Sequence, residues 1–202
     1  TLLQSRIDFE TMKKELYSYL LSAGYVSPDL SLSSYTAATL IALAQENGLS
    51  AQDEDRGWEI VTDIETKGMV GARLEPGVED MLYMLAGKWQ LTVLTNNSTA
   101  AALRALGDNR IANYFELIVG REQMETLKPS PAGIDYILRR FPTIARQRWL
   151  MIGDSWIDGK AAQAAGVPFV QYGGEAEEMT AHHVPVIAHI QNWTELEPLL
   201  MR

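Results

Sequence analysis

Apolar residues in the first third of the chain recur at helical spacing. After Asp8, which is placed to cap a helix, they lie three or four positions apart and form one helical face. These residues are Phe9, Met12, Leu16, Leu20 and Ala23, and Gly24 follows them as a stop. The same spacing predicts a second helix over residues 34–47 and a third from Ser50, with Asp53 completing a capping box. No strand pattern interrupts residues 7–68.

The pattern changes near Pro76, where short apolar runs begin to alternate with helical segments. Strands are predicted at residues 91–95, 115–119, 149–152, 167–172 and 184–187. Helices are predicted at residues 77–86, 98–106 (with Gly107 at its end), 131–141, 158–165 and 192–200. Strands that alternate with helices of this length imply right-handed crossovers and a parallel sheet. The sequence therefore predicts an α/β fold, a doubly wound parallel sheet preceded by an all-helical domain.

Composition narrows the class of protein. The chain has 202 residues, 47% of them hydrophobic, and no cysteine. Without cysteine there is neither a disulfide nor a thiolate nucleophile, which favours a cytoplasmic location. No apolar stretch reaches the ~20 residues that a transmembrane helix needs. A formal net charge of −9 without a basic patch argues against binding to nucleic acid or to an anionic membrane.

Polar residues follow three of the predicted elements, and the first set closes the strand at residues 91–95. Thr95 and Asn96 come where this strand opens into a helix. A hydroxyl and free backbone N–H groups at a helix N-terminus suit a phosphate oxygen. The alternative is that Asn97 or Ser98 simply caps the helix.

The second set is a lysine in a loop between a strand and a helix. Lys128 precedes Pro129, and Pro131 is placed to begin the next helix. A lysine held there supplies a compact positive charge to a phosphoryl group or to a carboxylate nucleophile. The alternative is a solvated surface lysine.

The third set follows the apolar run that ends at Ile152. Gly153 is succeeded by Asp154 and, four residues later, by Asp158. Open α/β sheets bind their ligands at the carboxyl ends of their strands, and two carboxylates there suit Mg²⁺. Helix capping is again the alternative, because aspartate and serine are common caps.

In this order, the three sets resemble the haloacid dehalogenase superfamily of phosphohydrolases. Thr95 resembles the superfamily's second motif. Lys128, which precedes a proline, resembles the third motif, and the segment from Gly153 to Asp158 resembles the fourth. Residues 74–78 and 161–173 resemble the phosphoglycolate phosphatase-like branch, which has a helical cap. The resemblance divides the chain into a remnant of the first core motif (residues 1–4), a helical cap (5–72) and a Rossmann-like α/β core (73–202).

The resemblance also implies a function, that of a phosphohydrolase dependent on Mg²⁺ and acting on a small phosphorylated metabolite through an aspartyl-phosphate intermediate. Thr95 and Lys128 would be catalytic, Asn96 would bind phosphate, and Asp154 and Asp158 would hold the metal. We expect no nucleic-acid or membrane partner, and either a monomer or a homodimer. Two alternatives stay open, a phosphomutase of the same fold and a catalytically inactive binding protein.

The sequence departs from the superfamily at its first motif, Asp-x-Asp-Gly-Thr, which carries the nucleophile and the general acid/base. The chain begins Thr1-Leu2-Leu3, which resembles the residues that follow that motif. The run from Asp53 to Asp55 has the spacing of the motif but lies in a predicted helix, where acidic residues favour the N-terminal end of the helix dipole. We therefore expect the nucleophile just upstream of Thr1, on a strand in the middle of the sheet.

Overall fold

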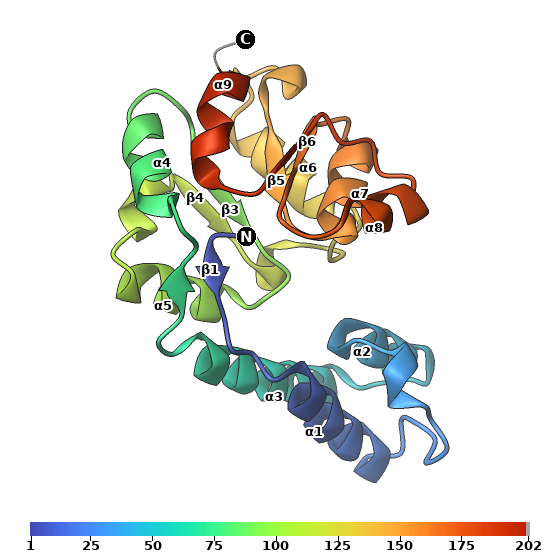
Figure 1. The fold of residues 1–202 in the computed structure, drawn as a ribbon. Coiled ribbons are helices and arrows are strands. Elements are labelled where there is room, and N and C mark those ends of the chain that lie inside the picture. The colour runs from blue at the N-terminus through green and yellow to red at the C-terminus, as the bar shows by residue number, and fades with distance from the viewer. Residues whose placement is uncertain (201–202) are drawn as a thin grey trace. The chain divides into compact units, whose positions relative to one another are not determined.

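A computed structural model describes residues 1–200 of the chain (Figure 1). The chain divides into two compact units. The helical unit comprises Ser5–Gly71, and the sheet unit comprises Thr1–Gln4 together with the residues from Ala72 onward. Each unit has its own hydrophobic core. In residues 1–200, no helix combines the length and the apolar character needed to span a membrane.

The helical unit consists of α1 (Phe9–Ser22), α2 (Ala37–Glu46) and α3 (Ala51–Met69), with a 3₁₀ turn at Leu32–Ser34. Their apolar faces enclose one core, whose fully buried members are Leu16, Leu20, Leu40, Ile41, Ala44 and Val61. The caps predicted at Asp8 and Ser50 are confirmed. The predicted start of the second helix is wrong by three residues, because Thr36 and Thr39 form a reciprocal capping box that fixes the start at Ala37.

Asp53, in the acidic run at the start of α3, stabilises the helical unit through hydrogen bonds. Asp53 accepts hydrogen bonds from Ser50 Oγ at 2.7 Å, Tyr19 Oη at 2.6 Å and Tyr25 Oη at 2.7 Å. These hydroxyl donors, that of Ser50 first, lower the pKa of Asp53 to about 2, and the bond to Asp53 raises the pKa of Tyr19 to about 12. The hydrogen bonds of Asp53 thus link α1, α3 and the loop after α1.

Within residues 1–200, the sheet unit contains seven short strands in three hydrogen-bonded groups. β1 (Leu3–Gln4) pairs antiparallel with β2 (Arg73–Leu74), and β3 (Thr92–Leu94) pairs parallel with β4 (Leu117–Val119). The third group is parallel throughout, in the order β5 (Met151–Gly153), β6 (Phe169–Tyr172) and β7 (Ala188–Ile190).

Helices follow the strands along the sheet unit. They are α4 (Val78–Leu85), α5 (Thr99–Asp108), α6 (Ala132–Arg140), α7 (Trp156–Ala165), α8 (Ala176–Ala181) and α9 (Glu197–Leu200). Short 3₁₀ turns lie at Ala112–Tyr114, Arg121–Gln123, Arg146–Arg148 and Trp193–Leu196.

Alternate residues of β6 face two different cores. Val170 and Tyr172 pack with α4 and the turn before α9, whereas Phe169 packs with α6, α7 and α8. β3 and β5 follow the same rule, since Val93 and Ile152 belong to the first core and Leu94 and Met151 to the second; successive side chains of a strand point to opposite faces. Helices therefore cover both faces, and the predicted doubly wound α/β fold is confirmed.

The parallel strands form two ribbons rather than one continuous sheet. Within residues 1–200, β3 pairs only with β4, and β5 only with β6 and not with β3. All four residues of β6 are buried, whereas every residue of β3 is only half-buried. β3 and β5 share both cores but present unpaired edges, where an unmade backbone hydrogen bond in the interior costs about 1–3 kcal/mol.

Several predicted boundaries differ from the structure. The helix expected to stop at Gly107 continues to Asp108, because the chain turns only at Arg110, whose φ is 59°. The strand expected at residues 184–187 is wrong, and the strand lies at Ala188–Ile190 instead. α8, β1 and β2 were not predicted, because each is too short for a periodic pattern to reveal it.

Replacing either of two helical glycines by alanine is expected to have opposite effects on stability, because one position is crowded and the other is open. A Cβ at Gly159 would lie 2.3 Å from Val184 Cγ1 and 3.0 Å from the Phe169 ring, whereas one at Gly107 meets nothing within 4 Å. We expect Gly159→Ala to lower the free energy of unfolding by about 1–3 kcal/mol through overpacking. Gly107→Ala is expected to raise it by up to about 1 kcal/mol, because alanine favours the helix. Urea denaturation of both variants checks this, and equal effects would contradict it.

Candidate active site

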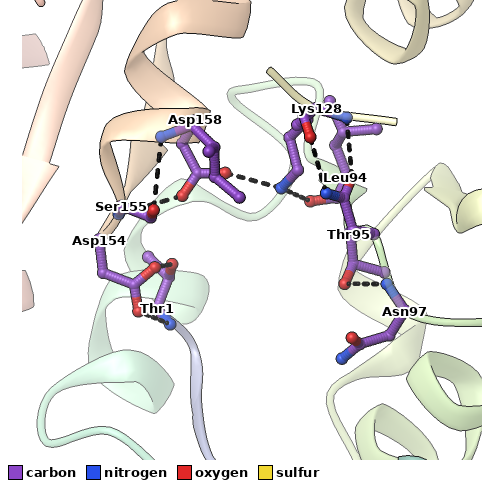
Figure 2. Close-up of polar contacts among 10 residues, drawn as sticks. Thr1, Leu94, Thr95, Asn97, Lys128, Asp154, Ser155 and Asp158 are labelled. Carbon is purple, nitrogen blue, oxygen red and sulfur yellow. Dashed lines mark hydrogen bonds and ion pairs between the residues drawn. The ribbon is translucent and has the colours of Figure 1, made fainter. Parts of the chain in front are cut away.

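Three segments of the sheet unit meet at the carboxyl ends of the parallel strands (Figure 2). The turn after β3 carries Thr95 and Asn96, and the segment after β5 carries Asp154 and Asp158. Lys128 enters from the loop between β4 and α6. Direct hydrogen bonds join Lys128 both to the end of β3 and to Asp158, so residues that are 30 or more positions apart form one site.

The turn after β3 leaves two hydrogen-bonding groups available to a ligand. Thr95 Oγ1 accepts a hydrogen bond from the Asn97 N–H at 3.1 Å, so its own hydroxyl hydrogen can still be donated. The Asn96 N–H has no acceptor among residues 1–200. Ser98 caps α5, as the alternative interpretation expected, but this leaves Thr95 and Asn96 outside the helix. The turn therefore offers donors suited to a phosphoryl oxygen.

Lys128 is not a solvated surface residue. Its ammonium donates to Asp158 Oδ1 at 2.7 Å and to the Leu94 carbonyl at 3.1 Å, and both side chains of the ion pair are only 8% exposed. An ammonium has three N–H donors, and these two bonds leave one for a ligand. Lys128 thus brings a largely desolvated positive charge, with a donor to spare, to the end of β3.

The Asn96 side chain holds the main chain of Lys128. Its Nδ2 donates to the Lys128 carbonyl at 3.0 Å, and its Oδ1 accepts from the Lys128 N–H at 2.9 Å. The expectation that Asn96 binds phosphate therefore concerns only its backbone N–H, because the carboxamide is already occupied.

Asp158 is both a capping residue and a member of the site. Ser155 caps α7, and the Ser155 N–H donates to Asp158 Oδ2 at 3.3 Å in a reciprocal capping box, so α7 begins two residues earlier than predicted. Gly153 makes this geometry possible, because a Cβ there would lie 2.5 Å from Asp158 Cβ. The other carboxylate oxygen is then aimed at Lys128.

Asp154 is the more accessible of the two aspartates, with a side chain that is 51% exposed. The amino group of Thr1 donates to Oδ2 and the Thr1 hydroxyl donates to Oδ1, both at 2.9 Å. Burial acts to raise the pKa of Asp154, but the Thr1 charge and hydrogen bonds outweigh it, so the pKa lies below its usual value. Asp154 is therefore an open carboxylate at the carboxyl end of β5.

The two aspartates predicted to hold Mg²⁺ differ in how well they fit that role. Asp154 fits, because its carboxylate is half-exposed and so open to a further ligand. The Asp158 oxygens are taken by Lys128 and Ser155. Among residues 1–200, no group of three or more acidic or histidine side chains is placed to surround a metal. These residues thus supply one carboxylate of the one or two that Mg²⁺ usually takes from a protein.

Two contacts beside the site could not be inferred from the sequence. Trp156, the first residue of α7, stacks on His182 with ring centroids 3.9 Å apart and ring planes 6° apart. Tyr172, at the end of β6, donates to Glu75 at 3.4 Å. Both contacts join residues that are far apart in the chain, and no local pattern marks either pair.

The fold and this site define an α/β protein in which a turn with available donors, a buried lysine and an open carboxylate lie at the carboxyl ends of the strands. A sequence profile of the haloacid dehalogenase-like hydrolases matches residues 12–172. This match covers most of the chain, which therefore belongs to the haloacid dehalogenase-like hydrolase family.

The chain is also similar to particular members of this family. A phosphoglycolate phosphatase from Rhodobacter capsulatus is 36% identical over 112 residues, which make up 55% of this chain and 48% of that protein. A superfamily hydrolase from Geobacter sulfurreducens has the same fold, with a TM-score of 0.61 and 23% identity over 98% of this chain and 91% of that one. A superfamily hydrolase from Bacillus subtilis, solved bound to magnesium, aligns with a TM-score of 0.59 and 22% identity over 95% and 80%. The chain spans about half the length of the curated relatives it matches.

The buried ion pair predicts a specific pattern of stability in single and double variants. Asp158→Ala leaves the Lys128 charge without its carboxylate and should lower the free energy of unfolding by about 3 kcal/mol. Adding Lys128→Met removes the stranded charge and should restore a large part of that loss. Chemical denaturation of the wild type and of these two variants measures both values. A double variant as unstable as Asp158→Ala alone would show that the charge pairing is not the source of the loss.

Proposed function

We propose that the protein is a Mg²⁺-dependent phosphohydrolase that acts on a small phosphorylated metabolite. One observation carries the proposal: the ammonium of Lys128, with a donor to spare, is fixed against the carbonyl of the residue before Thr95. A hydroxyl, a backbone N–H and a cation at the end of one strand suit the oxygens of a phosphoryl group. Membership of the haloacid dehalogenase-like hydrolases supports the same class of reaction.

In this proposal, each residue of the site has a separate task. The Thr95 hydroxyl and the Asn96 N–H donate to one phosphoryl oxygen and orient the group. Lys128 donates its remaining hydrogen to another oxygen or to the attacking carboxylate, and balances the charge that develops during transfer. Asp158 keeps the Lys128 ammonium aimed at that position. The helical unit has the role of the family's cap, which selects the substrate.

Asp154 is assigned as the carboxylate that holds Mg²⁺. Its exposure at the carboxyl end of β5 supports this role, and Asp158 would contribute through a water. The bound metal would reduce the repulsion between an anionic nucleophile and the phosphate. Magnesium in the related Bacillus subtilis hydrolase agrees with this assignment.

The proposal places the nucleophile on an aspartate of a strand that pairs with the free edges of β3 and β5. Two parallel ribbons with shared cores and unpaired neighbouring edges support such a strand. Its carboxyl end would deliver an aspartate next to Lys128 and Asp154. Attack on phosphorus would form an aspartyl-phosphate, and water would then release phosphate. A second carboxylate on that segment would protonate the leaving group and activate the water.

Phosphate release from a panel of small phosphoesters tests the function. The assay uses the full-length protein with Mg²⁺ and, separately, with EDTA. Phosphoglycolate is the first substrate to test, because similar proteins are phosphoglycolate phosphatases. Release that requires Mg²⁺ is the expected result. Isomerised sugar phosphate without release would identify a phosphomutase instead, and binding without turnover an inactive member of the family.

Asp154→Asn provides the sharpest test of the metal assignment. Removing the charge of the open carboxylate should lower Mg²⁺-dependent phosphate release by at least about 100-fold, because electrostatic stabilisation of the transferring group is lost. The melting temperature should change little, since the side chain is half-exposed. Asp80→Asn, the same change at an exposed position of α4, is the control and should keep full activity. Normal turnover in Asp154→Asn would refute the assignment.

A further inference from the structure

The main chain at Lys128 has no regular secondary structure to hold it. The residue lies in the loop between β4 and α6, and its neighbours Glu125, Thr126 and Pro129 are exposed. Among residues 1–200, the Lys128 N–H and carbonyl have one partner, the Asn96 carboxamide, which bonds to both. The position of the Lys128 backbone therefore depends on one side chain from another segment.

The residues on either side of Thr95 both contact Lys128. Leu94, before it, accepts from the Lys128 ammonium at 3.1 Å (Figure 2). Asn96, after it, binds the Lys128 main chain at 2.9 and 3.0 Å. Lys128 thus forms hydrogen bonds to the residues on both sides of Thr95. A shift of either segment must carry the other with it, so the Thr95 hydroxyl and the Lys128 ammonium keep a fixed relation.

Asn96 is itself held through its main-chain carbonyl. Its carbonyl accepts a hydrogen bond at 3.5 Å from Nη1 of Arg121, whose side chain is only 5% exposed. The Arg121 N–H donates to the next carbonyl, that of Asn97, at 3.0 Å. The turn after β4 therefore supports the turn after β3, and Asn96 lies between a buried arginine and the lysine of the site.

We propose that Asn96 is a positioning residue, whose carboxamide couples the Thr95 turn to Lys128 so that both meet the same phosphoryl group. As far as turnover is concerned, this inference rests on the proposed phosphohydrolase function. It assigns the side chain a task distinct from that of the Asn96 N–H, which stays available to the substrate. A displacement of about 1 Å at a positioned group can cost on the order of 100-fold in rate.

The test combines a structural readout with a kinetic one. Asn96→Ala should speed hydrogen exchange of the Lys128 amide at least 10-fold, measured by NMR, because that N–H loses its acceptor. The same variant should lower kcat for phosphate release by about 10- to 100-fold with little change in KM, because substrate contacts are kept while their alignment is lost. Asn96→Asp keeps an acceptor for the Lys128 N–H but loses the donor to its carbonyl. It should retain the exchange protection and fall between wild type and Asn96→Ala in kcat.

Asn97→Ala is the matched control, one position further along the same turn. The Asn97 side chain makes no hydrogen bond within residues 1–200, and alanine keeps the backbone N–H and carbonyl. Exchange of the Lys128 amide and kcat should both stay at their wild-type values. Melting temperatures of all variants separate local loosening from global unfolding, and Asn96→Asp keeps the test decisive if Asn96→Ala does not fold.

The outcomes separate this inference from the proposed function. Unchanged exchange at Lys128 in Asn96→Ala would overturn the coupling, and so would a raised KM at unchanged kcat, which would mean that the carboxamide contacts the substrate. Faster exchange with unchanged kcat would overturn its role in turnover. Faster exchange in Asn96→Ala, in a protein whose wild type releases no phosphate, would uphold the positioning and refute the phosphohydrolase.

Discussion

The buried Lys128 ammonium is the interaction on which the site depends. Taking a lysine charge out of water is unfavourable unless close partners replace the lost hydration. Asp158 and the Leu94 carbonyl are those partners, and they come from the segments after β5 and β3. One charge therefore connects the ends of two ribbons that share no backbone hydrogen bond in the part of the chain that the structure describes. The need to satisfy that charge fixes where the β3 turn, the lysine loop and α7 lie.

Local sequence patterns were enough to select residues that the structure brings together, but not to predict which of them pair. Thr95, Lys128 and Asp154 could be placed at a sheet edge because each follows a short apolar run or stands in a proline-bounded loop. Those features depend only on near neighbours. The contact between Lys128 and Asp158 spans 30 residues, and the role of the Asn96 side chain spans 32. Such contacts follow from how crossovers bring strand ends together, which no periodicity encodes.

The same distinction explains the errors in the predicted fold. α1, with three full turns of regular spacing, was predicted correctly with its cap, whereas two-residue strands such as β1 gave no pattern at all. Gly107 was read as a stop because glycine is a common helix terminator. Its Cβ position is open, so α5 has no steric reason to end there and runs on to Asp108. A glycine ends a helix only where the backbone turns at that residue, and here the turn comes at Arg110.

The division of the parallel strands connects the fold to the proposed chemistry. A strand with one paired edge and a half-buried face is an incomplete part of a sheet, yet β3 and β5 both contribute to the same two cores. A strand between them would satisfy both free edges at once and would end beside the Lys128 ammonium. An anionic nucleophile at that end would meet the Lys128 ammonium, which bonds to Asp158 and whose main chain bonds to Asn96. The stability of the sheet and the reactivity of the site would then depend on the same segment.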